Sequence, residues 1–189
     1  MLADILKKDT LANHHQLEKM LVGRMKTIRT TQDYIDLLHL FYSYFGGLEK
    51  QIDQHLDRNL LPDYEQRRKS ASLAHDIEAL GGTPPQTANG AALPTINSPL
   101  HAIAALYVIE GSTLGGKFIS KMIAQQLNIT DGKGLSFFNS YGPDTETMWN
   151  VFKDALNKQT TAANEQNEVV DAANKTFAKF KVWAERVLA

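Results

Sequence analysis

The chain has 189 residues, of which 43% are hydrophobic and 22% charged, a composition typical of a soluble globular domain rather than of a disordered or membrane protein. Twenty Lys and Arg against 21 Asp and Glu leave a formal net charge of -1, which gives no electrostatic attraction for nucleic acid or for an anionic membrane. The absence of cysteine excludes disulfides, thiolate metal sites and cysteine nucleophiles. With no signal-peptide pattern and no apolar run near 20 residues, we expect a cytoplasmic protein without a membrane partner.

Hydrophobic residues recur with helical spacing along nearly the whole chain, and the alternation typical of strands is essentially missing. Thr31 is a candidate N-cap for a long second helix, and Gly81 and Gly82 are a candidate stop for the third. The predicted helices are an N-terminal segment through Leu21, a long segment from Thr31, and residues 63–80, 99–127, 144–158 and 164–188. The sequence therefore predicts an all-α fold, one domain over residues 1–189 with six or seven helices, and loops over 83–99 and 128–143.

Three glycines interrupt the predicted helix over residues 99–127, at Gly111, Gly115 and Gly116. Each glycine inside a helix costs about 1 kcal/mol relative to alanine, so together they weaken the element by roughly 3 kcal/mol before packing compensates. Gly111 and Gly115 are four apart and share one face, and Ser112 and Gly116 form the adjacent row. A face without side chains either lets another helix pack closely or lets a flat ligand lie against the backbone at a bend. Spacing alone favours close packing.

The N-terminal helix carries a second candidate site, in the segment that runs from Thr10 through His14 and His15 to Glu18. At about 100° per residue, His14 lies roughly 60° from the centre of the apolar face and His15 roughly 160° from it. His14 therefore borders the core, and His15 points outward. Glu18 is one turn beyond His14, where a carboxylate fixes the imidazole tautomer and strengthens the other ring nitrogen as a ligand. Spacing alone leaves a metal-free structural histidine as the commoner alternative.

The remaining polar residues supply no further motif. There is no HExxH or ExxH pair, which disfavours a zinc protease or a di-iron carboxylate bundle, and there is no serine nucleophile elbow. The charged run from Glu65 through Arg67, Arg68 and Lys69 is interpreted as the solvated face of a helix.

The two candidate segments together resemble the heme oxygenase family, specifically its small soluble bacterial members that produce biliverdin. The family pattern T-x-x-x-H-x-x-x-E matches Thr10, His14 and Glu18, and the segment LYVIEGSTLGG over residues 106–116 matches the family's distal helix. Further matches lie in two segments, residues 134–142 and residues 169–183. The resemblance covers nearly the whole chain. It favours a ligand-binding role over a purely structural role for both the glycines and His14.

This resemblance implies that heme, which is both cofactor and substrate, lies between the two helices with His14 as the iron ligand. It implies a catalytic distal face formed by Gly111, Ser112 and Gly115. The residues expected to bind heme are His14, Glu18, Gly111, Gly115, Gly116, Lys7, Tyr141 and Lys117. Ser112 stands where mammalian relatives have an aspartate, and Glu168 stands where they have a propionate-pairing arginine. The propionate partners are therefore expected elsewhere, with Lys7 first, and then Lys117 and Tyr141.

The implied activity is oxidative cleavage of heme to biliverdin, carbon monoxide and ferrous iron, with O2 and electrons from a reductase, ferredoxin or flavodoxin-type donor. A heme-binding or storage protein that does not degrade heme remains an alternative, because His14 would serve it equally well. A bent distal helix without side chains favours the oxygenase, since storage does not require one. A structural helical protein that only inherits the fold is a third alternative, and the intact His14, Glu18, Gly111 and Gly115 weigh against it. A thiaminase-like enzyme on the same architecture would use a catalytic cysteine, which this chain lacks.

Overall fold

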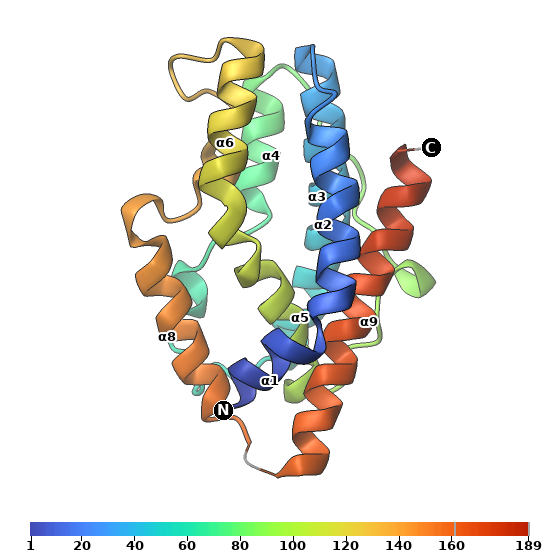
Figure 1. The fold of residues 1–189 in the computed structure, drawn as a ribbon, viewed down its shortest axis with the longest axis vertical. Coiled ribbons are helices and arrows are strands. Elements are labelled where there is room, and N and C mark those ends of the chain that lie inside the picture. Colours follow the sequence, from blue (N-terminus) through green and yellow to red (C-terminus); the bar gives the residue numbers. More distant parts are fainter. Residues whose placement is uncertain (161, 189) are drawn as a thin grey trace.

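The computed structural model describes residues 1–160 and 162–188, and in this part of the chain the fold is all-α, as predicted (Figure 1). The α-helices are α1 (Leu2–Asp9), α2 (Leu11–Met25), α3 (Thr31–His55), α4 (Ala71–Ala79), α5 (Pro99–Gly111), α6 (Thr113–Leu127), α7 (Ser136–Asn139), α8 (Thr145–Asn157) and α9 (Ala163–Leu188). Short 3-10 turns are η1 (Tyr64–Gln66), η2 (Gly90–Ala92) and η3 (Gly142–Asp144). The nine α-helices of the described residues exceed the predicted six or seven because the N-terminal helix divides at Thr10, the glycine-broken helix divides at Ser112, and α7 forms within the predicted loop over residues 128–143.

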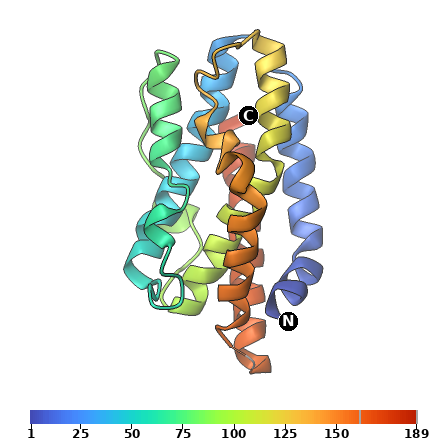
Figure 2. The same cartoon turned by 90° about the vertical axis from the view of Figure 1, so that its left-hand side faces the viewer.

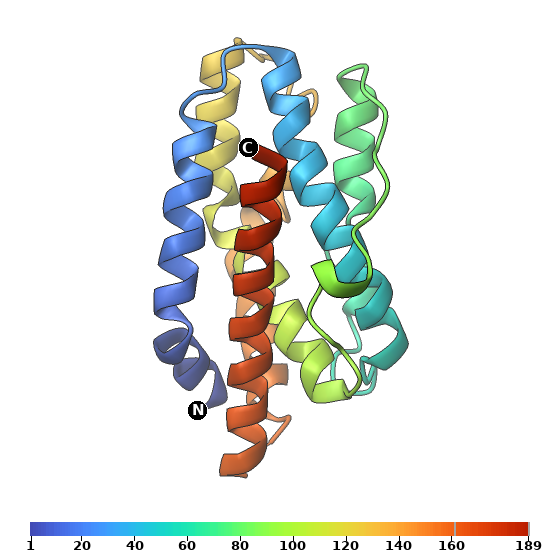
Figure 3. The same cartoon turned by 90° about the vertical axis from the view of Figure 1, so that its right-hand side faces the viewer.

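Helix α3 runs through the body of the molecule and packs against α4, α5 and α9. Helix α5 crosses α9, and α6 continues from α5 in a new direction on the side of the molecule that carries α2 (Figure 1). Helix α8 covers one flank of the molecule (Figure 2), and α9 covers the opposite flank (Figure 3). The glycine-broken helix and the helix that carries His14 therefore belong to the same region of the fold.

The core beneath these helices is aromatic. Tyr44 of α3 and Phe180 of α9 stack with ring centroids 4.5 Å apart, and Phe41 meets Phe138 edge to face at 5.5 Å. The Tyr44 hydroxyl donates to the Thr176 carbonyl at 2.7 Å, so this buried phenol keeps a hydrogen-bond partner. These contacts fix α9 and the segment around α7 against α3.

The predicted helix boundaries agree with the structure at several places and fail at one. Helix α5 begins at Pro99 as predicted, and Ser98 caps it with its hydroxyl accepting from the His101 amide. The long helix begins one residue away from the expected cap: Thr30, rather than Thr31, forms a capping box with Asp33. The prediction of one helix over residues 63–80 is wrong. Only η1 and α4 are helical there, because side chains in the connection between them turn inward.

The long connection over residues 83–98 is held against α3. The Ala88 amide donates to the Ser43 carbonyl at 2.8 Å, and a Cβ added at Gly47 would come within 2.3 Å of the Ala88 carbonyl oxygen. Trp183 of α9 donates to the Ser43 hydroxyl from the same region at 3.1 Å. The glycine in α3 therefore serves a close approach between the connection and the helix.

The segment Pro99–Leu127 has the length and apolarity of a membrane-crossing helix by composition alone, and within the described residues it is the one such segment. Its apolar window is 61% buried inside the fold, and core helices of globular proteins meet the same criterion. The segment also breaks at Ser112 and contains the ion-paired Glu110. These features are those of a core helix.

A buried carboxylate fixes α7 to α4. Asp76 is 1% exposed, and its oxygens accept from the Phe137 amide at 2.8 Å and from the Ser136 amide and hydroxyl at 3.0 and 2.7 Å. These are the free amides at the start of a short helix, so the carboxylate serves as their cap. The position of α7 matters because its carbonyls reach the distal helix, as described below.

We predict that Asp76→Ala lowers the free energy of unfolding by about 3 kcal/mol, because two backbone amides lose their partner inside the protein. Chemical denaturation measures this change. Glu78→Ala is the matched control on the same helix, since Glu78 is exposed, and it is expected to stay within about 0.5 kcal/mol of the parent. Equal effects of the two substitutions would contradict the capping role.

Candidate heme site

The helix break between α5 and α6 leaves backbone carbonyls without their usual amide partners, and side chains replace those partners. The Ser112 hydroxyl donates to the Ile109 carbonyl at 2.6 Å, and the Thr113 hydroxyl donates to the Glu110 carbonyl at 2.6 Å. Serine and threonine that bond back to the preceding turn in this way bend helices. The break therefore arises from the hydroxyl residues together with the flexible Gly111 before them.

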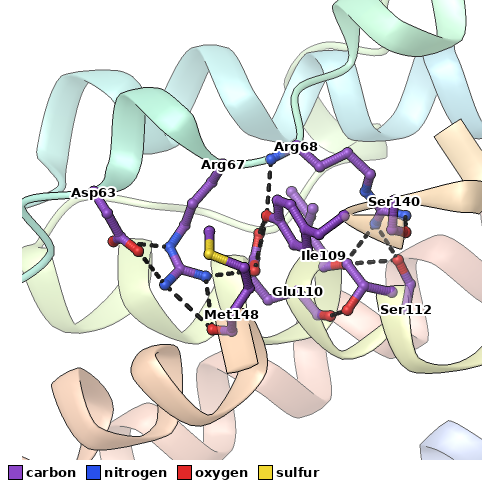
Figure 4. A network of polar contacts seen from close by, with 10 residues as sticks. Asp63, Arg67, Arg68, Ile109, Glu110, Ser112, Ser140 and Met148 are labelled. Atoms are coloured by element: carbon purple, nitrogen blue, oxygen red, sulfur yellow. Dashed lines mark hydrogen bonds and ion pairs between the residues drawn. The ribbon is translucent and has the colours of Figure 1, made fainter. Parts of the chain in front are cut away.

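Arg68 stabilises the helix break through hydrogen bonds from its guanidinium group. One guanidinium nitrogen, Nη2, donates to the Ile109 carbonyl at 2.9 Å and to the Ser112 hydroxyl at 2.5 Å (Figure 4). The other, Nη1, donates to the Phe137 carbonyl and to the Ser140 hydroxyl at 3.2 and 3.0 Å. A single planar side chain thus joins the distal helix break to α7.

Glu110 lies in the middle of a second set of charges. Its side chain is fully buried, and one of its oxygens accepts from Arg67 Nη1 at 2.6 Å (Figure 4). The Tyr141 hydroxyl donates to the same carboxylate at 3.0 Å and accepts from the Arg68 amide at 2.8 Å. Arg67 also forms an ion pair with Asp63 at 2.8 Å. The connection between η1 and α4 is in this way tied to α5 by buried ion pairs and hydrogen bonds.

The interpretation of the 65–69 run as a solvated face is wrong for its two arginines. Arg67 is 2% exposed and Arg68 8% exposed. A signal for this arrangement was present in the sequence, because Glu110 follows the apolar run from Ala102 to Ile109 and a carboxylate buried there needs a cation. The sequence could not show which of the 20 Lys and Arg residues supplies that cation.

Burial and charge act in opposite directions on these arginines. Burial lowers the pKa of Arg68 to about 10, opposed by Glu110 and Tyr141, so the guanidinium stays charged at neutral pH. Burial also acts to lower the pKa of Arg67, but the adjacent Glu110 and Asp63 carboxylates outweigh it and raise that pKa. The pKa of Tyr141 is raised by burial and then by Glu110, so this phenol remains a neutral donor.

The three glycines of the distal segment have different surroundings. A Cβ added at Gly115 would meet nothing within 4 Å, and one at Gly111 would make only an ordinary contact with Trp149. A Cβ added at Gly116 would come within 2.1 Å of the Phe138 carbonyl oxygen. Gly111 and Gly115 therefore leave the backbone open, whereas Gly116 permits α6 to pack against α7. The two roles that a glycine-lined face can have, an accessible backbone and close helix packing, therefore both occur within residues 111–116.

On the opposite side, His14 stands on α2 with its side chain half exposed. Its ring packs edge to face on Phe177 of α9, with centroids 5.7 Å apart. Its Nδ1 is 4.0 Å from a Glu18 carboxylate oxygen, too long for a direct hydrogen bond and suited to one through water. This leaves Nε2 as the nitrogen free to bind a metal. The amide of Asn13 donates to Asn174 of α9 at 2.7 Å and fixes the same turn of α2.

The two helices approach each other at both ends of this region. Near the start of α2, Thr10 lies close enough to Tyr107 of α5 to oppose in part the rise in the pKa of Tyr107 that burial causes. At the far end, the Gln126 amide donates to the Lys26 carbonyl at 3.4 Å. His14 is one turn beyond Thr10, and Gly111 is one turn beyond Tyr107.

Between these two meeting points, several residues on α2 and α6 are exposed rather than packed on each other. Gly115 is exposed, and so are its apolar neighbours Leu114 (51%) and Phe118 (65%). On α2, His14 is exposed as well. An apolar helix with an open glycine backbone and an accessible imidazole on a neighbouring helix fit a flat, hydrophobic ligand that a histidine can bind.

Comparison with known proteins agrees with this geometry. The family model described as "Heme oxygenase" matches residues 1–186. A heme oxygenase of Xanthomonas campestris pv. campestris is 26% identical over 147 residues, which are 78% of this chain and 86% of the relative. The chain belongs to the heme oxygenase family.

Solved structures show the same fold. The NO- and CO-bound heme oxygenase of Neisseria meningitidis aligns with a TM-score of 0.81 at 23% identity, over 99% of this chain and 92% of that one. The heme oxygenase of Leptospira interrogans aligns with a TM-score of 0.77 at 22% identity, over 97% of this chain and 98% of that one. A Synechocystis heme oxygenase in complex with heme aligns with a TM-score of 0.76 at 19% identity, over 98% and 91%.

The remaining sequence-predicted residues fall in several places. Lys7 on α1 and Lys117 on α6 are exposed and make no ion pair among the described residues. Tyr141 lies in the buried network with Glu110, so its hydroxyl already has partners. Glu168 of α9 pairs with His101 Nε2 at 3.1 Å, away from His14 and Glu18 on α2. Of the three expected propionate partners, the two lysines are therefore the ones with free charged groups.

The contrast between the two neighbouring glycines gives a matched pair of substitutions. Gly116→Ala is expected to lower the free energy of unfolding by about 3 kcal/mol, because the methyl group overlaps the Phe138 carbonyl. Gly115→Ala is expected to leave stability unchanged or raise it by up to about 1 kcal/mol through helix propensity, while weakening hemin binding about tenfold. Denaturation and hemin titration measure the two effects. Loss of stability in Gly115→Ala would contradict the open face.

Arg68→Lys tests the link between the helix break and α7. It keeps a positive charge but cannot donate to four acceptors in one plane. We expect the free energy of unfolding to fall by about 2 kcal/mol and the rate of heme degradation to fall about tenfold. The affinity for hemin is expected to change less than threefold. The split between rate and affinity distinguishes a misplaced distal helix from general unfolding. Equal losses in both would contradict the positioning role.

Proposed function

We propose that this chain degrades heme oxidatively to biliverdin, carbon monoxide and ferrous iron. The observation that supports this most directly is the accessible His14 together with the open backbone at Gly111 and Gly115. Membership of the heme oxygenase family supports the same conclusion. Bound heme supplies the oxidation chemistry, since its iron activates O2 next to the porphyrin edge that is to be cut.

On the proximal side, His14 binds the iron through Nε2. Glu18, through a water on Nδ1, holds the imidazole in the neutral tautomer that leaves Nε2 free to ligate. Phe177 supports the ring from α9 and fixes its plane. A neutral imidazole at His14 would give a bound iron less electron density than a thiolate would, which suits oxidation of the porphyrin itself.

On the distal side, the chain presents backbone rather than an acid or a base. Gly111 and Gly115 allow the helix to approach the heme plane closely and leave room for ordered water. The Ser112 hydroxyl already accepts from Arg68 and donates to Ile109, so its position is fixed, and its remaining lone pair can receive a hydrogen bond from such a water. The donation from the charged Arg68 strengthens the bond that the hydroxyl itself donates to the Ile109 carbonyl and so fixes its position.

The anionic propionates need cations at the edge of the site. Lys7 of α1 and Lys117 of α6 have exposed ammonium groups, and we propose that they bind the propionates. Tyr141 contributes through the Glu110 network that holds the distal helix in place. Gly116 contributes by allowing α6 to pack on α7.

The electrons come, in this proposal, from an external reductase, ferredoxin or flavodoxin-type protein, and the reaction takes place in the cytoplasm. The alternative of a heme-binding protein that leaves heme intact has no observation in its favour. It accounts for His14 but gives no reason for a distal helix that is broken, open at Gly111 and Gly115 and held by a buried arginine.

The deciding experiment is hemin titration followed by turnover in air, with catalase present and ascorbate or a reductase as donor. Loss of the Soret band with growth of the biliverdin absorption is the expected result, and His14→Ala is expected to abolish it while circular dichroism stays unchanged. His15→Ala is the control and should retain turnover. A Soret band that persists with a competent donor would leave a heme-binding protein only, and full turnover by His14→Ala would overturn the ligand assignment.

A further inference from the structure

We propose that His14, His15 and Glu18 form a binding site for a free divalent transition-metal ion, ferrous iron in the first place, which is available whenever heme does not occupy His14. The ligand atoms of these three side chains all lie within 4.8 Å of one another. Within the described residues, they are the one group of three histidine or acidic side chains gathered this closely.

The spacing on α2 brings the three residues together. Glu18 is four residues beyond His14 and three beyond His15, and both intervals place side chains on neighbouring positions of a helix surface. Glu18 is thus the common neighbour of two imidazoles whose rings are 5.8 Å apart between centroids. The expected outward direction of His15 is confirmed by its exposure, but its ring turns back toward the other two groups.

The ligand atoms must move closer together to bind one ion. His14 Nδ1 and the nearer Glu18 oxygen are 4.0 Å apart, and the three ligand atoms lie within 4.8 Å of one another. Two neighbouring ligands at about 2.1 Å from an octahedral ion are separated by about 3.0 Å, so the His14–Glu18 pair closes by about 1 Å, shared between two side chains. All three side chains are exposed, which gives them that freedom and gives the ion access from solvent.

The set of donors matches the chemistry of ferrous iron. Two imidazoles and one carboxylate are the ligand set of many non-heme iron(II) sites, in which the remaining positions are held by water. One carboxylate supplies a single negative charge, and exposed side chains lose rotamer freedom on binding. We therefore expect a dissociation constant on the order of 10 µM rather than nanomolar.

Heme and the free ion exclude each other at His14. An imidazole that ligates iron through Nε2 in its neutral form carries its proton on Nδ1, so it has no second lone pair to offer. The site is therefore complete only in the heme-free state. If the proposed function holds, the ferrous iron that the reaction releases would be set free next to His14, where His15 and Glu18 are the next ligands within reach.

Tag-free, heme-free protein titrated anaerobically with Fe2+, and in parallel with Co2+, tests this site by calorimetry. One ion per chain is the expected stoichiometry, and the visible bands of the Co2+ complex should show nitrogen and oxygen ligands. His15→Ala and Glu18→Gln are each expected to weaken binding about tenfold, and His14→Ala to abolish it. Prior loading with one equivalent of hemin should also abolish it.

His75→Ala is the matched control, because His75 is an exposed histidine on another helix, α4. It should bind the ion as the parent does. The proposal is overturned if the parent fails to bind one ion below millimolar concentration, or if His75→Ala weakens binding as much as His15→Ala. Ion binding without heme turnover would refute the proposed function alone, and normal turnover without ion binding would refute this inference alone.

Discussion

The interaction on which the rest of the site depends is the burial of Glu110 against Arg67. A carboxylate without solvent exposure in an apolar helix is tolerable only with a charged partner and further hydrogen bonds, which Arg67 and Tyr141 supply. Once Arg67 is drawn inward, the next residue, Arg68, is drawn in with it. Its guanidinium then occupies the helix break and satisfies the carbonyl of Ile109. The buried charged network and the break in the distal helix therefore depend on each other.

The segment around α7 that contacts this network contains a strained residue. Ser140 has a φ of +51°, a conformation that costs energy for a residue with a side chain, and its hydroxyl is held by Arg68. The same short segment presents the Phe138 carbonyl to Gly116, and this contact admits no side chain on α6. The backbone around α7 is thus constrained from both sides. A rigid support of this kind lets the open turn at Gly111 and Gly115 keep its shape without side chains of its own.

The proximal side differs from the distal side because its side chains are exposed and weakly constrained. His14 is fixed mainly by the ring of Phe177 and by the Asn13 contact in the same turn, while Glu18 and His15 remain free to move. A rigid distal face and an adaptable proximal helix suit a site that must accept a large planar substrate and later release three different products. In the ion site that we propose, His14, His15 and Glu18 bind one of those products, the metal ion.

The sequence by itself determined the helical fold, the break near Gly111 and the start of a helix at Pro99, because these depend on spacing and composition along one segment. It did not determine which glycine is open and which is packed, since Gly115 and Gly116 differ only in what another segment places against them. Nor did it place Arg67 and Arg68 inside, because a charged run has the same local pattern whether it faces water or a buried carboxylate. Such features rest on contacts between residues about 20 to 70 positions apart in the chain, and only tertiary packing decides them.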